Sequence, residues 1–190
     1  MNRIDRAFAM ADGGRVTFLQ TAGETEGALL EMQVTYAPGS GQPPLHIHPE
    51  QEERFEVLRG ALWTRIGDEE QVYGPGATFV VPVGTAHTMR PEAPGTTEVR
   101  WLVRPALESE AFFRTAWGLD PDAPGVRRSG LLRSVALVRR FAREFRLVSP
   151  PYALQRVIFA LLGPVAVWAG HQMPPRSDAG NRGRKTRSVV

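Results

Sequence analysis

Two histidines, His46 and His48, stand one residue apart and are followed at once by three carboxylates, Glu50, Glu52 and Glu53. Because alternate residues of an extended strand share a face, the two imidazoles are directed toward one point. A cation held there needs further ligands, and the carboxylates are candidates. The sequence contains no cysteine, so a metal must be bound by nitrogen and oxygen atoms, and disulfides and cysteine nucleophiles are excluded.

A third histidine, His87, can join this pair from a distant strand. It follows an apolar stretch and a turn that contains Gly84. Three imidazoles and one carboxylate form a sulfur-free set that suits one divalent metal ion: Fe, Mn, Zn, Ni or Co. In an extended segment Glu52 and Glu53 point to opposite faces, so only one of them is expected to bind the ion.

The segments that must position these residues are β-rich. Between about Arg15 and Arg104, short apolar runs alternate with breaks rich in Gly and Pro, which leaves little room for a helix. Many short strands at even spacing indicate a sandwich or a small barrel. The expected strands are Val16–Gln20, Leu29–Tyr36, Arg54–Leu58, Ala61–Ile66, Gln71–Tyr73, Ala77–Val81 and Thr97–Val103, with shorter pieces near His46 and His87.

Residues 41–60 resemble the first motif of the cupin (RmlC-like) superfamily, in which His-x-His is followed by a glutamate and, after six intervening residues, a glycine. In this chain four residues separate His48 from Glu53, and six separate Glu53 from Gly60. The spacing to the glycine selects Glu53 over Glu52. The motif usually begins with a glycine six positions before the first histidine, where this chain has Ser40 between two glycines.

A later segment resembles the second cupin motif, beginning after an interval of 15 residues. Its matching positions are Gly76, Pro82, Gly84 and His87. The asparagine that often ends this motif is Pro91 here, which concerns the turn rather than the metal. The resemblance covers about residues 28–104 and implies a mostly β fold, a cupin-like double-stranded jelly-roll β-barrel. It also implies a metal site formed by His46, His48, Glu53 and His87.

Such a site leaves coordination positions open for water, dioxygen or a substrate oxygen, and Glu53 is the candidate catalytic base. The resemblance allows oxygenase, isomerase or cyclase chemistry on a small organic molecule. Strand parity predicts the bulky side chains that face the barrel interior and could contact this substrate. They are Tyr36, Phe55, Trp63, Phe79, Met89 and Trp101.

After Pro105 the apolar period changes to three and four residues, which predicts helices. The expected helices are Leu107–Trp117, an amphipathic Leu131–Val148 with arginines on its polar side, and Tyr152–Gly170, broken or kinked at Gly163-Pro164. We therefore expect a cupin barrel over residues 1–105, a helical C-terminal extension over residues 106–173 and a disordered basic tail over residues 174–190.

Charge is divided unevenly along the chain. Residues 1–99 carry a net charge of −7, residues 100–173 carry +6 and residues 174–190 carry +4. No helix-turn-helix sequence is evident, so specific nucleic-acid binding is not expected. The charged N-terminal segment lacks the apolar core of a signal peptide, and a cytoplasmic location is expected.

The uncharged segment Val157–Gly170 is shorter than the ~20 residues that a membrane span needs. It is expected to pack on the barrel or on a partner subunit, in a homo-oligomer such as a homodimer, with membrane-surface contact through the C-terminal helices as the alternative. The favoured function is a metal-dependent enzyme acting on a small molecule. One alternative is a non-catalytic cupin that binds or senses a small-molecule ligand. A second is a peripheral membrane or assembly protein acting through residues 131–170.

Overall fold

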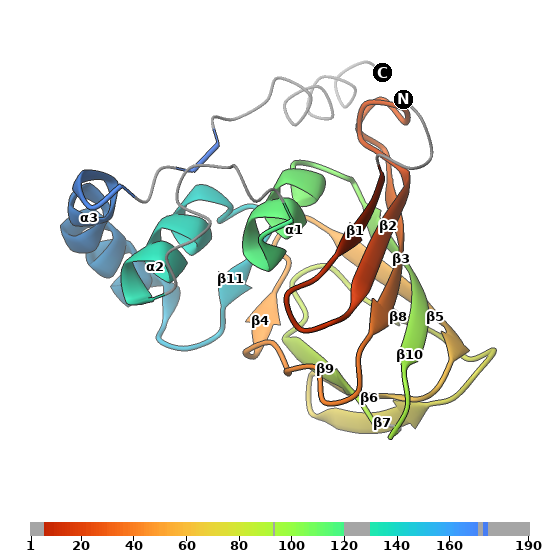
Figure 1. Cartoon of the computed structure of the whole chain (residues 1–190). Helices are drawn as coiled ribbons and strands as arrows, with labels where there is room; N and C mark the ends of the chain where they lie inside the picture. Colours follow the sequence, from red (N-terminus) through yellow and green to blue (C-terminus); the bar gives the residue numbers. More distant parts are fainter. Residues whose placement is uncertain (1–5, 93, 120–129, 171–172, 175–190) are drawn as a thin grey trace, which may run out of the picture.

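The computed structural model describes residues 6–92, 94–119, 130–170 and 173–174 (Figure 1). Within these residues the chain forms two antiparallel sheets and three helices. The predicted tail over residues 174–190 lies outside the described residues except for Pro174.

The two sheets form the jelly-roll barrel that the sequence predicts. The first sheet has the strand order β1-β2-β3-β10-β5-β8 and the second has the order β11-β4-β9-β6-β7. The strands of the first sheet are β1 (Ala7–Ala9), β2 (Arg15–Gln20), β3 (Leu30–Tyr36), β5 (Glu52–Arg59), β8 (Thr78–Val81) and β10 (Thr97–Arg104). The strands of the second are β4 (His46–Ile47), β6 (Leu62–Ile66), β7 (Glu69–Tyr73), β9 (His87–Pro91) and β11 (Arg146–Leu147).

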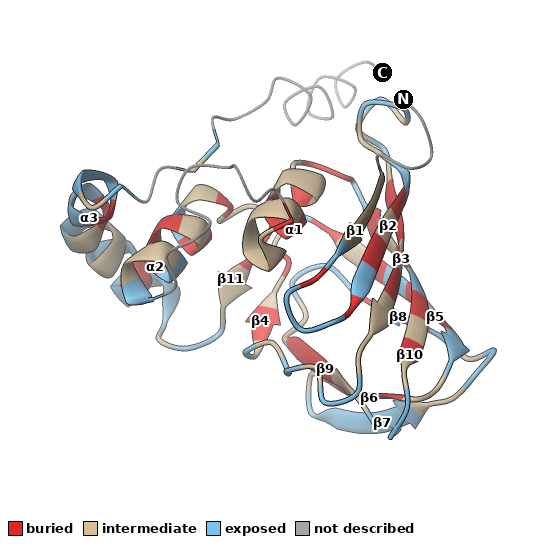
Figure 2. Ribbon diagram, viewed as in Figure 1, coloured by how far each residue is buried: buried red, intermediate tan, exposed pale blue. Residues whose placement is uncertain are grey.

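Alternation along the strands creates the barrel core. In β10 the residues Val99, Trp101 and Val103 are buried, whereas the residues between them are partly or fully exposed (Figure 2). Strand β5 pairs with β10 and alternates in the same way, so that Phe55 and Val57 also face inward. Burying each large apolar side chain of this kind contributes about 1.5–3 kcal/mol. The core therefore fixes which face of each strand points into the barrel.

The extension contains α1 (Ser109–Trp117), α2 (Leu131–Arg140) and α3 (Tyr152–Trp168). Helix α1 ends where Gly118 adopts a left-handed backbone with φ of 65°, a conformation that glycine accepts readily. Helix α3 continues through Gly163 and Pro164, so the predicted interruption does not end it.

The predicted helix over Leu131–Val148 is wrong in its second half. Helix α2 ends at Arg140, a turn follows, and residues 146–147 form β11. Two aromatic side chains of this turn, Phe141 and Phe145, are buried against Phe112 of α1, with ring centroids 5.5 and 5.3 Å from it. Packing of these two rings and pairing of β11 with β4 therefore outweigh the apolar period, which favours continuing the helix to Val148.

Strand β11 connects the extension to the barrel. It pairs antiparallel with β4, placing Arg146 opposite Ile47 and Leu147 opposite His46. Nearby, the guanidinium of Arg143 donates two hydrogen bonds to the Glu50 carboxylate, at 3.0 and 2.7 Å. The extension thus continues one of the barrel's sheets beside the histidine motif (Figure 1).

Candidate metal centre

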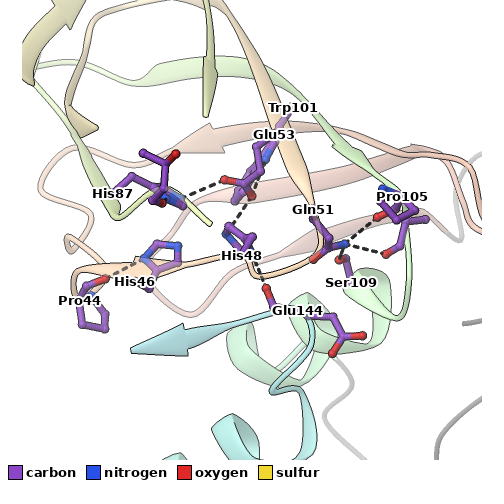
Figure 3. Close-up of polar contacts among 12 residues, drawn as sticks. Pro44, His46, His48, Gln51, Glu53, His87, Trp101, Pro105, Ser109 and Glu144 are labelled. Atoms are coloured by element: carbon purple, nitrogen blue, oxygen red, sulfur yellow. Dashed lines mark hydrogen bonds and ion pairs between the residues drawn. The ribbon is translucent and has the colours of Figure 1, made fainter. Parts of the chain in front are cut away.

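The four predicted ligands come together inside the barrel (Figure 3). His46 on β4 stands directly opposite His87 on β9, and His48 follows β4 on the same face as His46. Glu53 approaches from β5 of the other sheet. All four residues are buried, and one ring nitrogen from each histidine lies within 4.8 Å of the other two. The bend at residues 49–50 carries the chain from the histidines to Glu53.

Backbone carbonyl groups orient the three imidazole rings. Each Nδ1 atom lies within hydrogen-bond distance of a carbonyl oxygen, which can only accept, so Nδ1 carries a proton and Nε2 is the atom left for a metal ion. The pairs are His46 with Pro44 at 2.8 Å, His87 with Thr85 at 3.0 Å, and His48 with Glu144. The three Nε2 atoms are therefore the ones that a metal ion would contact, and the C-terminal extension positions one of the three rings, that of His48.

The Glu53 carboxylate lies between two of these rings. Its Oε1 atom is 3.2 Å from His48 Nε2, and its Oε2 atom is 3.0 Å from His87 Nε2. Both nitrogens and Oε2 are buried without a partner in hydrogen-bond geometry. Trp101 Nε1 donates to Glu53 Oε1 over 3.2 Å and so orients the carboxylate. A cation among these atoms would satisfy all of them, so the residues present fit a divalent metal.

Burial and mutual charge set the protonation of the cluster. Burial, followed by the positive charge of His87 and His48, lowers the pKa of His46 to about 3. His46 is therefore neutral at pH 7, the form that binds metal. Burial opposes ionisation of Glu53, but the neighbouring histidines outweigh it and hold its pKa below the ordinary value. The neutral imidazole of His46 and the ionised carboxylate of Glu53 thus face the same point. Burial opposes the charged form of His87, but the Glu53 carboxylate outweighs it and raises the pKa of His87.

A cavity of about 890 Å³ adjoins the cluster, and all three histidines line it. Three of the six side chains predicted to face a substrate also line it: Tyr36, Met89 and Trp101. Glu53 does not line the cavity, because it lies among Trp101 and the histidines with no exposed surface. Contact between these side chains and a substrate stays a prediction.

The other three predicted side chains lie elsewhere. Phe55 and Phe79 stack on each other inside the core, with ring centroids 4.9 Å apart. Trp63 alternates with the buried Leu62 and so faces outward, where Arg90 lies over its ring at 4.8 Å. Parity along β6 places Trp63 outside the barrel, and the stacked pair is part of the packed interior rather than of the cavity wall.

The C-terminal extension supplies cavity residues that sequence reasoning missed. They come from α1, α2 and the segment at β11, and include Phe112, Phe113, Trp117, Leu137, Val138, Phe145 and Leu147. Phe145 stacks on His46 itself, with centroids 4.6 Å apart and planes 25° apart. A sequence signal for this wall is the aromatic content of residues 112–117, a segment that sequence reasoning assigned only to a helix.

Residues 32–104 match the family model described as Cupin domain. This segment is a domain of the cupin superfamily. The match contains both histidine motifs and ends with β10, so the helical extension lies beyond the matched cupin domain. No curated protein sequence matches this cupin.

Several solved structures are similar to this cupin at low sequence identity. KdgF from Halomonas sp. is 19% identical, with a TM-score of 0.48, over 58% of this chain and 94% of that one. The protein TT1209 from Thermus thermophilus is 19% identical, with a TM-score of 0.45, over 55% and 95%. The polyketide cyclase RemF from Streptomyces resistomycificus is 21% identical, with a TM-score of 0.45, over 56% and 78%.

The two adjacent glutamates provide a test of the ligand set. Glu53→Gln should lower the affinity for a divalent metal by at least about tenfold, because it removes a charged oxygen donor from the cluster. Glu52→Gln should change it by less than about twofold, since Glu52 lies on β5 with its side chain on the other face. Competition with a chromogenic chelator measures both affinities. Equal retention of metal by the two variants would contradict the choice of Glu53.

Proposed function

We propose that this cupin is a divalent-metal-dependent enzyme that acts on a small and largely apolar organic molecule. The observation that carries the proposal is the convergence of three imidazoles and one carboxylate beside a cavity of about 890 Å³. Of these ligands, the three histidines line the cavity, so an ion held by them has an open side toward a bound molecule.

The chain's own residues have distinct tasks in this proposal. The histidines bind the ion through their Nε2 atoms, and Glu53 adds a negative charge while Trp101 holds its carboxylate in place. When bound, the metal supplies Lewis-acid chemistry, polarising an oxygen atom of the substrate. Because Glu53 does not reach the cavity surface, we assign it the role of ligand and no proton transfer.

The cavity wall supports an apolar substrate. Its aromatic side chains are Tyr36, Trp101, Phe112, Phe113, Trp117 and Phe145. Burial, with the nearby charges of Glu53 and Asp12, raises the pKa of Tyr36, so its neutral hydroxyl can donate a hydrogen bond. Apart from the histidines, the charged residues among those lining the cavity are Asp12 and Arg90. A wall with one arginine favours a neutral aromatic molecule over a phosphorylated sugar.

The experiment that tests this function separates turnover from binding. The metal-free protein is loaded separately with Fe(II), Mn(II), Zn(II), Ni(II) and Co(II) and incubated with a panel of aromatic hydroxy and keto compounds. Mass spectrometry follows their conversion, and tryptophan fluorescence follows binding, because Trp101 and Trp117 line the cavity.

We expect at least one compound to be converted by one metal form and by neither the metal-free protein nor the His46→Ala/His87→Ala variant. If compounds bind with the same affinity with and without metal, and none is converted, the chain is a binding module and the enzymatic proposal is wrong.

A further inference from the structure

One face of α3 carries a continuous apolar stripe that is exposed. Its residues are Leu154, Val157, Leu161, Val165 and Trp168, at spacings of three and four residues, with exposed fractions of 51, 52, 68, 45 and 89%. These spacings place the five side chains on one side of the helix. We refer to this set as the outer stripe.

The opposite side of α3 holds the helix against the rest of the protein. Gln155, Gly163 and Ala166 are buried there, and Phe159 packs against the core. At Gly163, α3 lies close to α2: the Arg139 side chain of α2 occupies the space that a Cβ atom at position 163 would need. The Gln155 amide donates to the carbonyl groups of Leu147 and Pro150, at 2.8 and 2.6 Å. The outer stripe is therefore a second apolar face, left over after α3 has packed.

The position of α3 makes the outer stripe accessible. The helix lies at the end of the molecule away from β6 and β7, with α2 between it and the barrel (Figure 1). Its outward surface is largely exposed (Figure 2). Aromatic residues stand at both ends of the helix, Tyr152 at the beginning and Trp168 at the end, as is common where a protein meets a membrane interface.

Charge near α3 is of one sign. From residue 145 to residue 177 the sequence contains three arginines and neither aspartate nor glutamate. Two of the arginines are placed by the structure: Arg156 on α3 is exposed, and Arg146 lies over the Tyr152 ring at 4.2 Å. Beyond this stretch, residues 178–190 add four basic side chains and one acidic one. An apolar stripe beside positive charge is complementary to an anionic bilayer, where each basic residue near the surface adds ~1 kcal/mol.

We propose that α3 docks this protein on an anionic lipid bilayer, lying in the interface with its outer stripe against the acyl chains and its arginines at the phosphate groups. No helix in the described part of the chain is long and apolar enough to cross a membrane. In the proposed arrangement the 17 residues of α3 lie along the surface. The site faces away from the histidine cluster, so the proposal is independent of the proposed function.

The test is co-sedimentation of the full chain with vesicles of phosphatidylcholine alone and with vesicles that also contain phosphatidylglycerol. We expect binding to the anionic vesicles that weakens as salt is raised. Leu161→Glu should lower the partition coefficient by at least about tenfold, because it places a charge in the outer stripe, which would contact the acyl chains. Arg156→Glu should lower it by more than about fivefold on anionic vesicles.

A matched control is Val72→Glu on β7, which changes a side chain of similar exposure, 49%, on the barrel. It should leave vesicle binding unchanged. Circular dichroism confirms that each variant is folded, and a blue shift of tryptophan emission that Trp168→Phe removes locates the contact at α3.

Two outcomes would overturn the proposal. One is the absence of binding to anionic vesicles by the folded wild-type chain. If sedimentation then shows a dimer that Leu161→Glu dissociates, the outer stripe is a dimer interface instead. The other is vesicle binding that Leu161→Glu and Val72→Glu weaken equally.

Discussion

Replacing His87 by alanine is expected to lower the affinity for a divalent metal by more than about 100-fold. His87 is fully buried, stands opposite His46 in the sheet and contacts the Glu53 carboxylate at 3.0 Å. Removing a residue that only hydrogen-bonds to a metal ligand already lowers metal affinity by about 10–100-fold. Removing a ligand itself should lower it further. Titration calorimetry with Zn(II) or Co(II) measures the change.

A suitable control for this variant lies two residues along the same strand. Met89 is also buried and also lines the cavity, but it is not part of the cluster. Met89→Ala should destabilise the fold by about 2–5 kcal/mol and leave metal affinity within a few-fold of the wild type. Comparable metal loss in both variants would mean that packing around the cavity, rather than the His87 nitrogen, holds the ion.

Phe145→Ala should affect both stability and the metal centre. The side chain is buried and stacks on His46 and on Phe112, at 4.6 and 5.3 Å. Truncation should lower the free energy of unfolding by about 3–5 kcal/mol, as for other buried phenylalanines. It should also weaken metal binding by about tenfold, because the His46 ring loses the surface that holds its orientation. Urea unfolding and chelator competition measure the two effects.

The nearby Phe141 separates these two effects. It is fully buried in the same turn and packs on Phe112, yet it has no ring contact with the histidines among the described residues. Phe141→Ala should cost a similar free energy of unfolding while leaving metal affinity nearly unchanged. If both variants lose metal equally, the extension supports the site only through overall stability.

The barrel and the histidine cluster are the parts that sequence could predict. Strand periodicity is local, because the pleat alone decides that His46 and His48 share a face. The spacing of the motifs then relates this pair to Glu53 and His87, and the structure brings all four together. Strand β1, with three residues, was not predicted, since so short a segment contains too little alternation to be recognised.

The cavity wall was beyond sequence reasoning because it depends on what each apolar face packs against. A helical period shows that Phe145 is buried, but not that its ring meets His46. The helical period also predicted that α2 continues to Val148, whereas residues 146–147 form β11. So short a strand is stabilised by pairing with β4, which its own residues do not reveal. The hydrogen bond from the His48 ring to the Glu144 carbonyl involves the backbone of residue 144. Any residue type can supply such a carbonyl, so the sequence does not reveal the contact.

That single carbonyl makes the metal site and the C-terminal extension thermodynamically linked. If an ion binds more tightly when Glu144 holds the His48 ring, the bound ion must stabilise the docked extension by the same free energy. Adding metal should therefore protect residues 141–148 from hydrogen exchange and from proteolysis, although no residue of that segment binds the ion.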